Sequence, residues 1–251
     1  MRRTEYPRAS AYDPAWLISL DMGPNPLWLL EDLSRDLHLR PGMRVLDLGS
    51  GRGATSVFLA REFDVEVWAV DLWVPPDAAS AVFEAAGVRD RVHPMKANAH
   101  DLPFAHEQFD VIVSVDAFEY FGTGDNYLPY IVRFLAPGGK LAVATPGLKR
   151  EIRELGSIPE HIRALVGWEA IAWHTPEWWR FQWGITGLVD VTAARLQPTG
   201  GRDWLLWARA CLEQGVPAAQ ATIDMLEADN GDLLSFAMVV AQKRDAPRSP
   251  I

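Results

Sequence analysis

The segment VLDLGSGRGATSVFLAREFDVEVWAVD, residues 45–71, combines glycines and acids at a spacing that suits a ligand-binding loop. Gly49 and Gly51 follow an apolar run typical of a buried strand, and a glycine loop in this place offers backbone N–H groups to a ligand. The pattern G-x-G-x-x-A from Gly49, with Asp71 ending the next apolar run, fits the dinucleotide fingerprint, in which the acid binds ribose. An oxidoreductase that uses NAD or NADP is therefore one interpretation.

Asp47 and Gly53 favour a different ligand for the same loop. Asp47 lies two residues before Gly49, where a carboxylate would repel a pyrophosphate but accept hydrogen bonds from an ammonium group, directly or through water. Gly53 extends the pattern to D-x-G-x-G-x-G, which lets the backbone approach an amino-acid-like group as well as a nucleoside. The loop also follows an expected helix that can close over the ligand. These features predict a ligand with a zwitterionic amino-acid end.

Strands and helices alternate around the glycine loop. The expected strands are 43–49, 65–71, 91–97, 109–116 and 140–147, and the expected helices are 25–39, 54–63, 77–88 and 127–135. This alternation predicts βαβ units, and therefore a parallel sheet with right-handed crossovers. Two more strands, at 187–196 and 233–244, and two more helices, at 203–214 and 218–229, follow.

The expected fold is a doubly wound, mostly parallel, seven-stranded Rossmann-like α/β sheet with helices on both faces and a helical lid insertion. We expect a single domain over residues 1–251. Its parts are an N-terminal helical cover, 1–40, a cofactor-binding core, 41–147, a helical substrate-lid insertion, 148–186, and C-terminal strands and helices, 187–251. The end of the chain, APRSPI at 246–251, is expected to be frayed.

In this order the motifs resemble those of the class I S-adenosylmethionine-dependent methyltransferases. VLDLGSGRG is similar to the first motif of that family, VEVWAVDLW to the second, ANAHDLPFAHEQFDVIVSVDAFEYF to the segment that holds adenine, and FLAPGGKLAVATP to the fifth-strand motif. The family commonly has Asp where this chain has Asn98, whose carbonyl oxygen can still bind the adenine amino group. The resemblance covers roughly residues 40–146 and implies S-adenosyl-L-methionine as cofactor, with S-adenosyl-L-homocysteine as product.

The resemblance also implies a set of cofactor-binding residues. The glycine loop and Asp47 would hold the methionine end, Asp71 the ribose, and Asn98 the adenine edge. Each has a structural alternative: Asp71 can cap a turn, Gly53 can serve helix–strand packing, and Asn98 can form an Asx-turn. The full set is Asp47, Gly49, Ser50, Gly51, Gly53, Asp71, Leu72, Asn98, Ala99 and Asp116.

Candidate catalytic residues follow the expected fourth strand, in SVDAFEYFGTGDNY. Methyl transfer depends mainly on positioning, with removal of a proton where the acceptor starts neutral. Asp116 and Glu119 are three residues apart, so one helical turn places both on the same face. We expect Glu119 or Tyr120 to accept a proton or orient the acceptor, with His100 as a third candidate; a helix cap or salt bridge is the alternative for Glu119.

The segment FEYFGTGDNYLPYIVRFLAPGG also resembles the cyclopropane fatty acid synthase branch, which has F-E-H-V-G followed by N-Y and a helix. Tyr120 stands where that branch carries the histidine of its anion-assisted alkene chemistry. We therefore expect no cyclopropanation of lipids. The net charge of −9 and the lack of a basic membrane-binding face agree with this expectation.

Tryptophans concentrate in HTPEWWRFQWG, residues 174–184. Trp179 and Trp183 are four residues apart on one helix face, whereas Trp178 points elsewhere. These indoles form either a packed lid core or an aromatic wall for a flat apolar acceptor or an amine. We expect at least one of the three to line the acceptor pocket. Weaker candidates come from the N-terminal segment: Tyr12, Trp16 and Met22.

Composition narrows the possible partners to a small-molecule substrate. The net charge of −9 repels nucleic-acid phosphates, and no run approaches the ~18 apolar residues of a membrane-spanning helix. Cys211 is the single cysteine, which excludes an internal disulfide and a cysteine metal cluster, and we expect no metal. The basic start MRRTEYPRAS is not followed by the apolar region of a signal peptide, so we expect a cytoplasmic location. A protein that binds S-adenosylmethionine without turnover is a third interpretation, and the sequence gives no oligomeric state.

Overall fold

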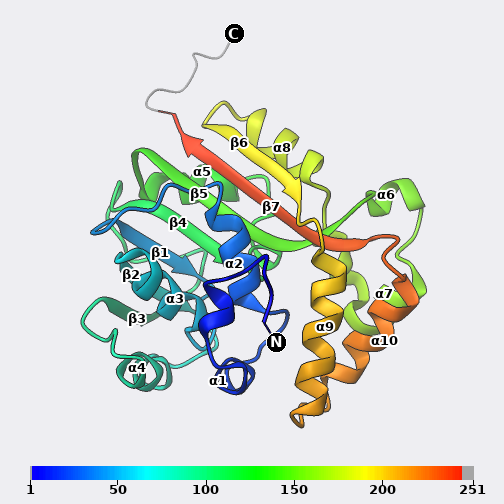
Figure 1. Cartoon of the computed structure of the whole chain (residues 1–251). Helices are drawn as coiled ribbons and strands as arrows, with labels where there is room; N and C mark the ends of the chain where they lie inside the picture. The colour runs from blue at the N-terminus through cyan, green and yellow to red at the C-terminus, as the bar shows by residue number, and fades with distance from the viewer. Residues whose placement is uncertain (1, 245–251) are drawn as a thin grey trace.

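A single seven-stranded sheet forms the centre of the molecule, which is described here from a computed structural model covering residues 2–244 (Figure 1). The end at 246–251, expected to be frayed, lies outside the described residues. The strand order is β3-β2-β1-β4-β5-β7-β6. The strands are β1 (Arg44–Leu48), β2 (Glu66–Asp71), β3 (Val92–Lys96), β4 (Phe109–Val115), β5 (Leu135–Leu148), β6 (Val189–Leu196) and β7 (Leu234–Lys243).

The strands β1 to β5 pair in parallel, and β7 pairs antiparallel with both β5 and β6. The predicted doubly wound, mostly parallel sheet is therefore confirmed. Pro94 lies within β3, where the missing N–H is tolerated because β3 is an edge strand that pairs only with β2. The fifth strand begins at Leu135, earlier than predicted, because Leu135 pairs with Phe109 before a register shift.

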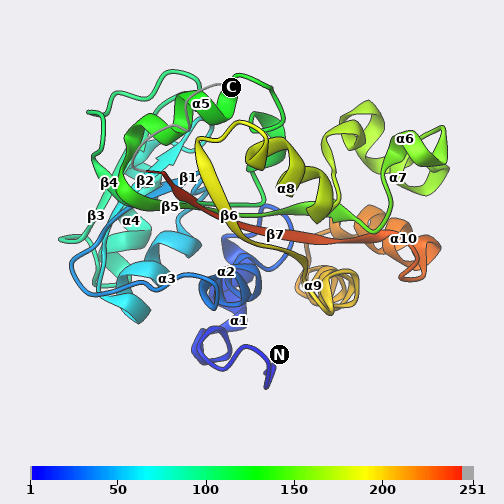
Figure 2. The same cartoon turned by 90° about the horizontal axis from the view of Figure 1, so that it is seen from above.

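Helices cover both faces of the sheet (Figure 2). Successive strand residues point to opposite faces, so Val45 packs in one apolar cluster and Leu46 in the other. The first face carries α2 (Pro26–Ser34), α3 (Ala54–Phe63), α4 (Pro76–Ala85), α9 (Gly200–Glu213) and α10 (Ala219–Asp229). The second face carries α5 (Tyr127–Ile131), the short 3-10 helices η2 (Phe118–Tyr120) and η3 (Val132–Phe134), and α8 (Pro176–Gly184).

Capping side chains fix the starts of the helices that flank the site. The Asn25 side-chain oxygen accepts hydrogen bonds from the N–H groups of Leu27 and Trp28, both at 3.1 Å, and Pro26 occupies the first turn of α2. Thr175 caps α8 in the same way, by accepting from the Trp178 N–H at 3.2 Å. None of the described helices is long and apolar enough to cross a membrane.

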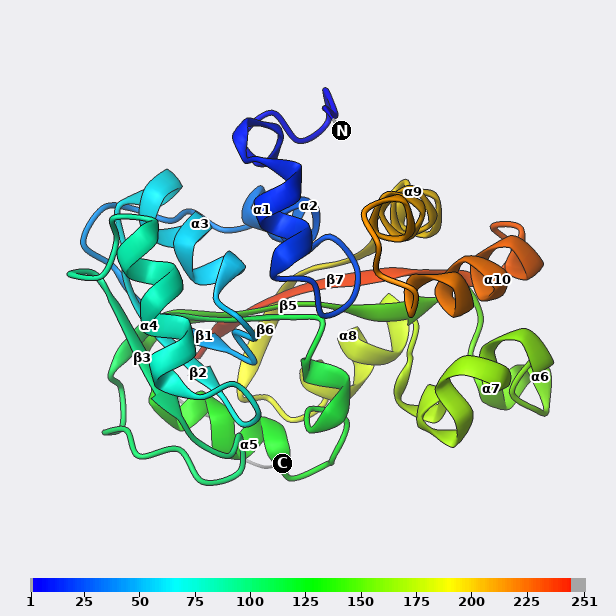
Figure 3. The same ribbon diagram turned by 90° about the horizontal axis from the view of Figure 1, so that it is seen from below.

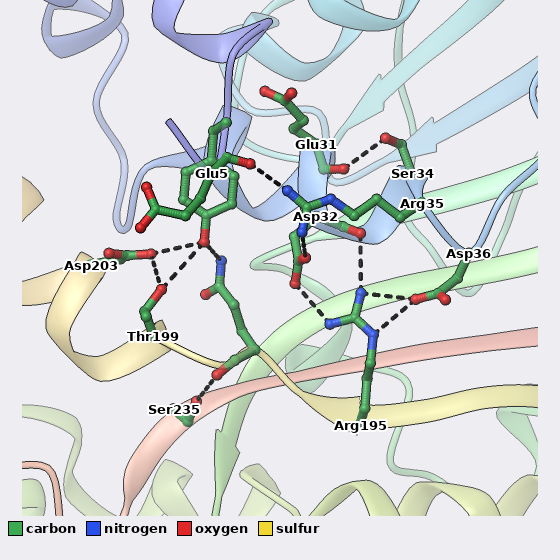
Figure 4. A network of polar contacts seen from close by, with 12 residues as sticks. Glu5, Glu31, Asp32, Ser34, Arg35, Asp36, Arg195, Thr199, Asp203 and Ser235 are labelled. Atoms are coloured by element: carbon green, nitrogen blue, oxygen red, sulfur yellow. Dashed lines mark hydrogen bonds and ion pairs between the residues drawn. The ribbon is translucent and has the colours of Figure 1, made fainter. Parts of the chain in front are cut away.

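A polar network holds the N-terminal segment against the C-terminal part of the chain (Figure 4). This segment contains η1 (Ala9–Ala11) and α1 (Pro14–Ser19) before α2. Arg195 of β6 donates to the Asp32 carboxylate at 2.8 Å and to Asp36 at 3.0 Å. The Tyr6 hydroxyl donates to Asp203 of α9 at 2.8 Å. The N-terminal cover is therefore a fixed wall of the fold.

We expect Arg195→Met to lower the free energy of unfolding by about 1–3 kcal/mol, measured by urea denaturation. Asp32 is only 2% exposed, so its carboxylate loses a partner that water cannot replace, although Arg35 at 3.0 Å remains. The control is Arg209→Met, whose partner Glu227 is half-exposed, and it should change stability by less than about 0.5 kcal/mol. Equal effects of the two substitutions would contradict an anchoring role for Arg195.

The segment between β5 and β6 divides into two parts. Its first part consists of α6 (Ile152–Leu155), α7 (Glu160–Val166) and the 3-10 helix η4 (Gly167–Ala172). In this part α7 packs against α10, near the ends of the long strands β5 and β7 (Figure 3). Its second part, α8, packs on β6 and β7 as a helix of the sheet layers. The helical insertion predicted over 148–186 therefore includes one helix, α8, that packs on the sheet, and its role as a substrate lid stays a prediction.

Candidate cofactor and acceptor site

A cavity of about 360 Å³ lies at the carboxyl ends of β1, β2 and β4. The strand order reverses at β1, between β2 and β4, and this is where open α/β sheets bind ligands. Most of the residues predicted for the site come together around this cavity. They are Gly49, Ser50, Gly51, Asp71, Leu72, Asn98, Ala99, His100, Asp116, Tyr120 and Met22.

The glycine loop after β1 forms one wall of the cavity with its backbone. Gly49 has φ of +79°, and a Cβ atom there would lie 2.3 Å from the Cβ of Ala117. Gly51 has φ of +53°, and a Cβ atom there would lie 3.0 Å from the sulfur of Met22. Both positions combine a left-handed backbone with a close neighbour, so only glycine fits without a shift of the loop.

Asp71 at the end of β2 joins the glycine loop to the following turn. Its Oδ2 accepts a hydrogen bond from the Gly51 N–H at 2.8 Å, and its Oδ1 accepts from the N–H groups of Trp73 at 2.7 Å and Val74 at 2.9 Å. The carboxylate therefore caps a turn, as the alternative interpretation held, and it also lines the cavity.

Asn98 and Ala99 form the wall that follows β3. The Asn98 side-chain oxygen accepts from the His100 N–H at 2.9 Å, which is the Asx-turn given above as the alternative. The Ala99 carbonyl oxygen accepts from the Tyr127 hydroxyl at 3.2 Å, and the His100 ring lies edge-on to Tyr127 at 5.2 Å. These contacts fix the loop at the cavity, where one lone pair of the Asn98 oxygen is already used.

Asp47 and Gly53 lie outside the cavity lining, and their predicted contact with the ligand is corrected. The buried Asp47 carboxylate accepts hydrogen bonds at 2.6 Å from the hydroxyls of Thr55 and Ser56 in α3, and burial raises its pKa to about 6. Its Oδ1 has no hydrogen-bond partner, so contact through water stays a prediction. Gly53 faces Phe83, whose ring would lie 2.4 Å from a Cβ at that position. Gly53 therefore serves helix packing.

Glu119 also lies outside the cavity lining, so a direct catalytic contact is corrected. Its side chain is 7% exposed, and its Oε2 accepts from the Thr145 hydroxyl at 2.8 Å. Burial raises the pKa of Glu119 to about 7, although the Thr145 hydrogen bond lowers it in part. Burial, Glu119 and Asp21 together hold the pKa of Asp116 well above its usual range. Asp116, which lines the cavity, is therefore the better placed acid.

Tyr120 lies at the cavity with its ring edge-on to Trp73, at 5.7 Å between centroids. The two rings are 59% and 64% exposed, which is high for such large apolar groups. Partial burial and the charges of nearby acids raise the pKa of Tyr120 to about 12. At neutral pH the hydroxyl therefore keeps its proton, so Tyr120 can orient an acceptor but is poorly suited to accept a proton.

The tryptophans of α8 are part of the apolar core, contrary to the expectation that one of them lines the cavity. Trp179 and Trp183 are 0% and 1% exposed, and each ring lies 5.8 Å from that of Phe118. Trp178 stacks on His174 at 3.6 Å. The physical reason is that α8 covers the face of β6 and β7.

Tyr12 and Trp16 are likewise not part of the cavity lining. The Tyr12 hydroxyl donates to Glu62 at 3.0 Å, and its ring packs against Trp16 and Phe58. Both candidates therefore belong to the contact between the N-terminal segment and α3. Met22, the third candidate of this segment, does line the cavity.

Sequence reasoning missed Arg52 and Trp73, which both line the cavity. Arg52 lies inside the glycine loop, and its guanidinium donates to the Ser19 carbonyl oxygen at 3.1 Å. Trp73 follows the second strand by two residues, and a tryptophan in a short loop beside a predicted ribose-binding acid was the available signal. Within residues 2–244 no three His, Cys, Asp or Glu side chains are placed to hold a metal ion.

Comparisons with known proteins agree on one kind of domain. A protein-family model described as a methyltransferase domain matches residues 45–139. The O-methyltransferase rstn1 of Aspergillus nomiae is 30% identical over 117 residues, which are 46% of this chain and 52% of that protein. The cyclopropane-fatty-acyl-phospholipid synthase of Escherichia coli K12 is 34% identical over 123 residues, which are 48% of this chain and 31% of that protein.

The likeness in fold extends over nearly the whole chain. Phosphoethanolamine N-methyltransferase 2 of Haemonchus contortus, solved with S-adenosyl-L-methionine, has a TM-score of 0.73 and 22% identity, over 97% of this chain and 59% of that chain. The chain spans about half or less of the two curated relatives named above. The matched residues 45–139 contain the glycine loop, Asp71 and the Asn98 loop, which together form most of the cavity. Residues 45–139 therefore match a methyltransferase domain, and the fold of the chain is similar to that of a methyltransferase solved with S-adenosyl-L-methionine.

Proposed function

We propose that this chain transfers a methyl group from S-adenosylmethionine to a small-molecule acceptor. The observation that carries the proposal is the cavity in which the backbone of Gly49 and Gly51, the Asp71 carboxylate and the Asn98 loop converge. Its volume of about 360 Å³ lies in the range of small-molecule sites. Relatives and structural neighbours described as methyltransferases support the same activity.

The residues present fit the parts of S-adenosylmethionine. The glycine loop, where a Cβ atom would collide, leaves room for the methionine end, and Arg52 would bind its carboxylate. Asp71 would accept a hydrogen bond from a ribose hydroxyl with the lone pair that remains on Oδ2, since Oδ1 already accepts two hydrogen bonds and Oδ2 one. The loop of Asn98 and Ala99 would hold the adenine edge.

The chemistry that S-adenosylmethionine supplies when bound is an electrophilic methyl group on a positively charged sulfur. The task of the chain is to bring the acceptor in line with that methyl group and to exclude water, which accounts for most of the rate in such a reaction. Met22 from the N-terminal cover, and Trp73 with Tyr120 at the opening, form apolar walls for this purpose.

The two other interpretations are less favoured. Dinucleotide-binding sheets usually have the order 3-2-1-4-5-6, whereas here an antiparallel β7 lies between β5 and β6. Asp47, the argument against NAD in the sequence, does not distinguish NAD from S-adenosylmethionine, because its carboxylate bonds to α3 and does not line the cavity. A binding protein without turnover would leave the exposed Trp73 and Tyr120 rings unexplained.

Calorimetric titration of the purified chain with S-adenosylhomocysteine and, separately, with NAD tests the proposal. We expect S-adenosylhomocysteine to bind with micromolar affinity and NAD to give no measurable heat. Transfer of radiolabelled methyl from S-adenosylmethionine to a mixed panel of small acceptors then separates an enzyme from a binding protein. Binding of NAD in preference to S-adenosylhomocysteine would overturn the proposal.

We expect Asp71→Asn to weaken S-adenosylhomocysteine binding by about tenfold or more, measured by calorimetry. The carboxylate accepts hydrogen bonds from the N–H groups of Gly51, Trp73 and Val74 with both of its oxygens. The amide of asparagine has one acceptor oxygen and no charge, so it cannot accept all of these hydrogen bonds. Asp77→Asn, on the exposed surface of α4, is the matched control and should leave the affinity unchanged. An unchanged affinity in Asp71→Asn would remove this residue from the cofactor site.

The proposal includes a small-molecule partner and a cytoplasmic location for the protein. The net charge of −9 supports a small-molecule substrate over nucleic acid, and the single Cys211 supports a reducing, cytoplasmic location. Secretion of the natural protein into the medium, detected by immunoblotting of cell fractions, would contradict that location.

A further inference from the structure

The side chain of Asp116 lines the cavity, yet it has no hydrogen-bond or ion-pair partner within residues 2–244. It follows β4, and its N–H donates to the Ala144 carbonyl oxygen at 2.7 Å. Its Oδ2 lies so close to the N-terminal segment that a Cβ atom on Gly23 would be 2.4 Å away. The carboxyl group is therefore held between the end of β4 and Gly23, in the loop between α1 and α2.

The charged groups that act on Asp116 are acids from two different elements. Glu119 approaches from η2, and Asp21 approaches from the loop between α1 and α2. The Asp21 carboxylate accepts from the Trp207 indole N–H at 3.0 Å, which fixes it against α9. A partly buried carboxylate among other acids is destabilised unless a cation approaches it. In the described part of the chain, no basic side chain forms an ion pair with Asp116.

The cavity around Asp116 is independent evidence for the kind of ligand. Trp73 and Tyr120 expose most of their ring surface at its opening, and Met22 adds an apolar wall. Aromatic faces attract cations and also pack against apolar groups. Neither basic side chain of the lining is paired with Asp116 in the described residues: Arg52 lies in the glycine loop and donates to Ser19, and the His100 ring packs against Tyr127. The cavity therefore suits a cation with an apolar body.

We infer that the methyl acceptor is an amine whose nitrogen lies against Asp116, beneath the Trp73 and Tyr120 rings. This inference rests on the proposed methyl transfer and names its substrate class. It also changes the predicted role of Asp116 from cofactor binding to acceptor binding. An anionic acceptor would place another negative charge beside Asp116, Asp21 and Glu119, and a neutral alcohol would bring no positive charge to Asp116.

Asp116 has two tasks in this arrangement. It binds the acceptor as an ammonium ion and then takes one N–H proton, which frees the nitrogen lone pair. The nitrogen gains the methyl group, the sulfur of S-adenosylmethionine keeps the electron pair of the broken carbon–sulfur bond, and the methylated product carries the positive charge. A carboxyl group with a raised pKa is a better proton acceptor for this step than an ordinary aspartate.

Matched sets of amines, alcohols and carboxylic acids that share one carbon skeleton test the inference on the full chain. The probes are benzyl, octyl and phenethyl compounds, added to protein saturated with S-adenosylhomocysteine and followed by thermal shift. Methyl transfer from radiolabelled S-adenosylmethionine gives a second readout. We expect the amines to raise the melting temperature and to accept methyl, and their alcohols and acids to do neither.

Asp116→Asn supplies the residue-level test, because asparagine tolerates the positive φ of +53° as well as aspartate does. We expect unchanged affinity for S-adenosylhomocysteine, within about threefold, together with loss of the amine-induced shift and at least a thirtyfold fall in amine methylation. Asp90→Asn, in the exposed turn before β3, is the control and should behave as wild type.

Several outcomes would overturn the inference. Amines that respond no more than their alcohols or acids would show that the cavity does not select a cation. An Asp116→Asn variant that loses S-adenosylhomocysteine binding would return Asp116 to the cofactor site. If wild-type protein does not bind S-adenosylhomocysteine at all, the proposed function itself fails, which is a separate and distinguishable result.

Discussion

Gly49→Val is expected to abolish cofactor binding, with the affinity for S-adenosylhomocysteine falling at least 100-fold in calorimetric titration. Gly49 has φ of +79°, a conformation that a β-branched residue adopts only at high cost, and its Cβ atom would lie 2.3 Å from the Ala117 Cβ. Relief of that contact must move either the glycine loop or the segment after β4. Both line the cavity, so the hydrogen-bond donors of the loop are displaced from the ligand.

Two other glycines separate backbone strain from the loss of the site. Gly42 has nearly the same φ of +78° but no atom within 4 Å of a Cβ position, so Gly42→Val should cost about 1–3 kcal/mol of stability and leave binding intact. Gly53→Ala meets Phe83 outside the cavity lining and should also lower stability more than affinity. Equal loss of binding in all three variants would show that strain alone, and not the shape of the loop, explains the result for Gly49.

The part of the site that depends on local backbone pattern could be predicted from the sequence. Apolar runs separated by helices gave the parallel strands, and parallel strands bring their carboxyl ends to one edge of the sheet. Gly49, Asp71 and Asn98 each follow a predicted strand, so their convergence at one cavity needs only the strand order. The order itself, β3-β2-β1-β4-β5-β7-β6, comes from the structure.

The position of Asp47 was predictable from the period of a strand but was misread. Side chains alternate along β1, so Asp47 points to the same face as Val45, toward α3. On that face it meets Thr55 and Ser56, at the first turn of the helix that follows the loop. A carboxylate there stabilises the loop from below, whereas the backbone of the loop itself faces the cavity.

The tryptophans of α8 could not be placed from the sequence. The spacing of Trp179 and Trp183 shows that both lie on one helix face, but not whether that face meets a lid, a cavity or the sheet. The choice depends on where α8 packs, and the long antiparallel pair β5–β7 with β6 offers it an apolar face. The inward face of α8 therefore belongs to the apolar core. The tryptophan that lines the cavity is the exposed Trp73, and not one of the tryptophans of α8.

Glu119→Gln is expected to make the protein more stable than wild type at pH 8, by up to about 3 kcal/mol in the free energy of unfolding. Burial raises the pKa of Glu119 from 4.5 to about 7, so ionisation at pH 8 places an unfavourable charge inside the protein. Glutamine has the same shape, carries no charge, and its side-chain oxygen can still accept the hydrogen bond from Thr145.

The sign of the pH dependence follows from which state holds the proton. Between pH 4.5 and about pH 7 the folded protein keeps a proton on Glu119 that the unfolded chain has lost. The stability contributed by this group is therefore fully present below pH 4.5 and is lost as the pH rises through 7, by at most about 1.4 kcal/mol per pH unit. Removing the charge of Glu119 also lowers the pKa of Asp116 toward its usual range, because Glu119 is one of the acids that raise it.

The difference between the urea unfolding free energies of wild type and Glu119→Gln, measured from pH 5 to pH 8, cancels the titrations common to both proteins and leaves Glu119 with the Asp116 that it shifts. The difference should widen in favour of the variant as the pH rises and level off above about pH 7. Glu84→Gln, on the exposed surface of α4, should give a flat difference near zero. A constant difference for Glu119→Gln would mean that Glu119 is already ionised at pH 5, which contradicts the raised pKa.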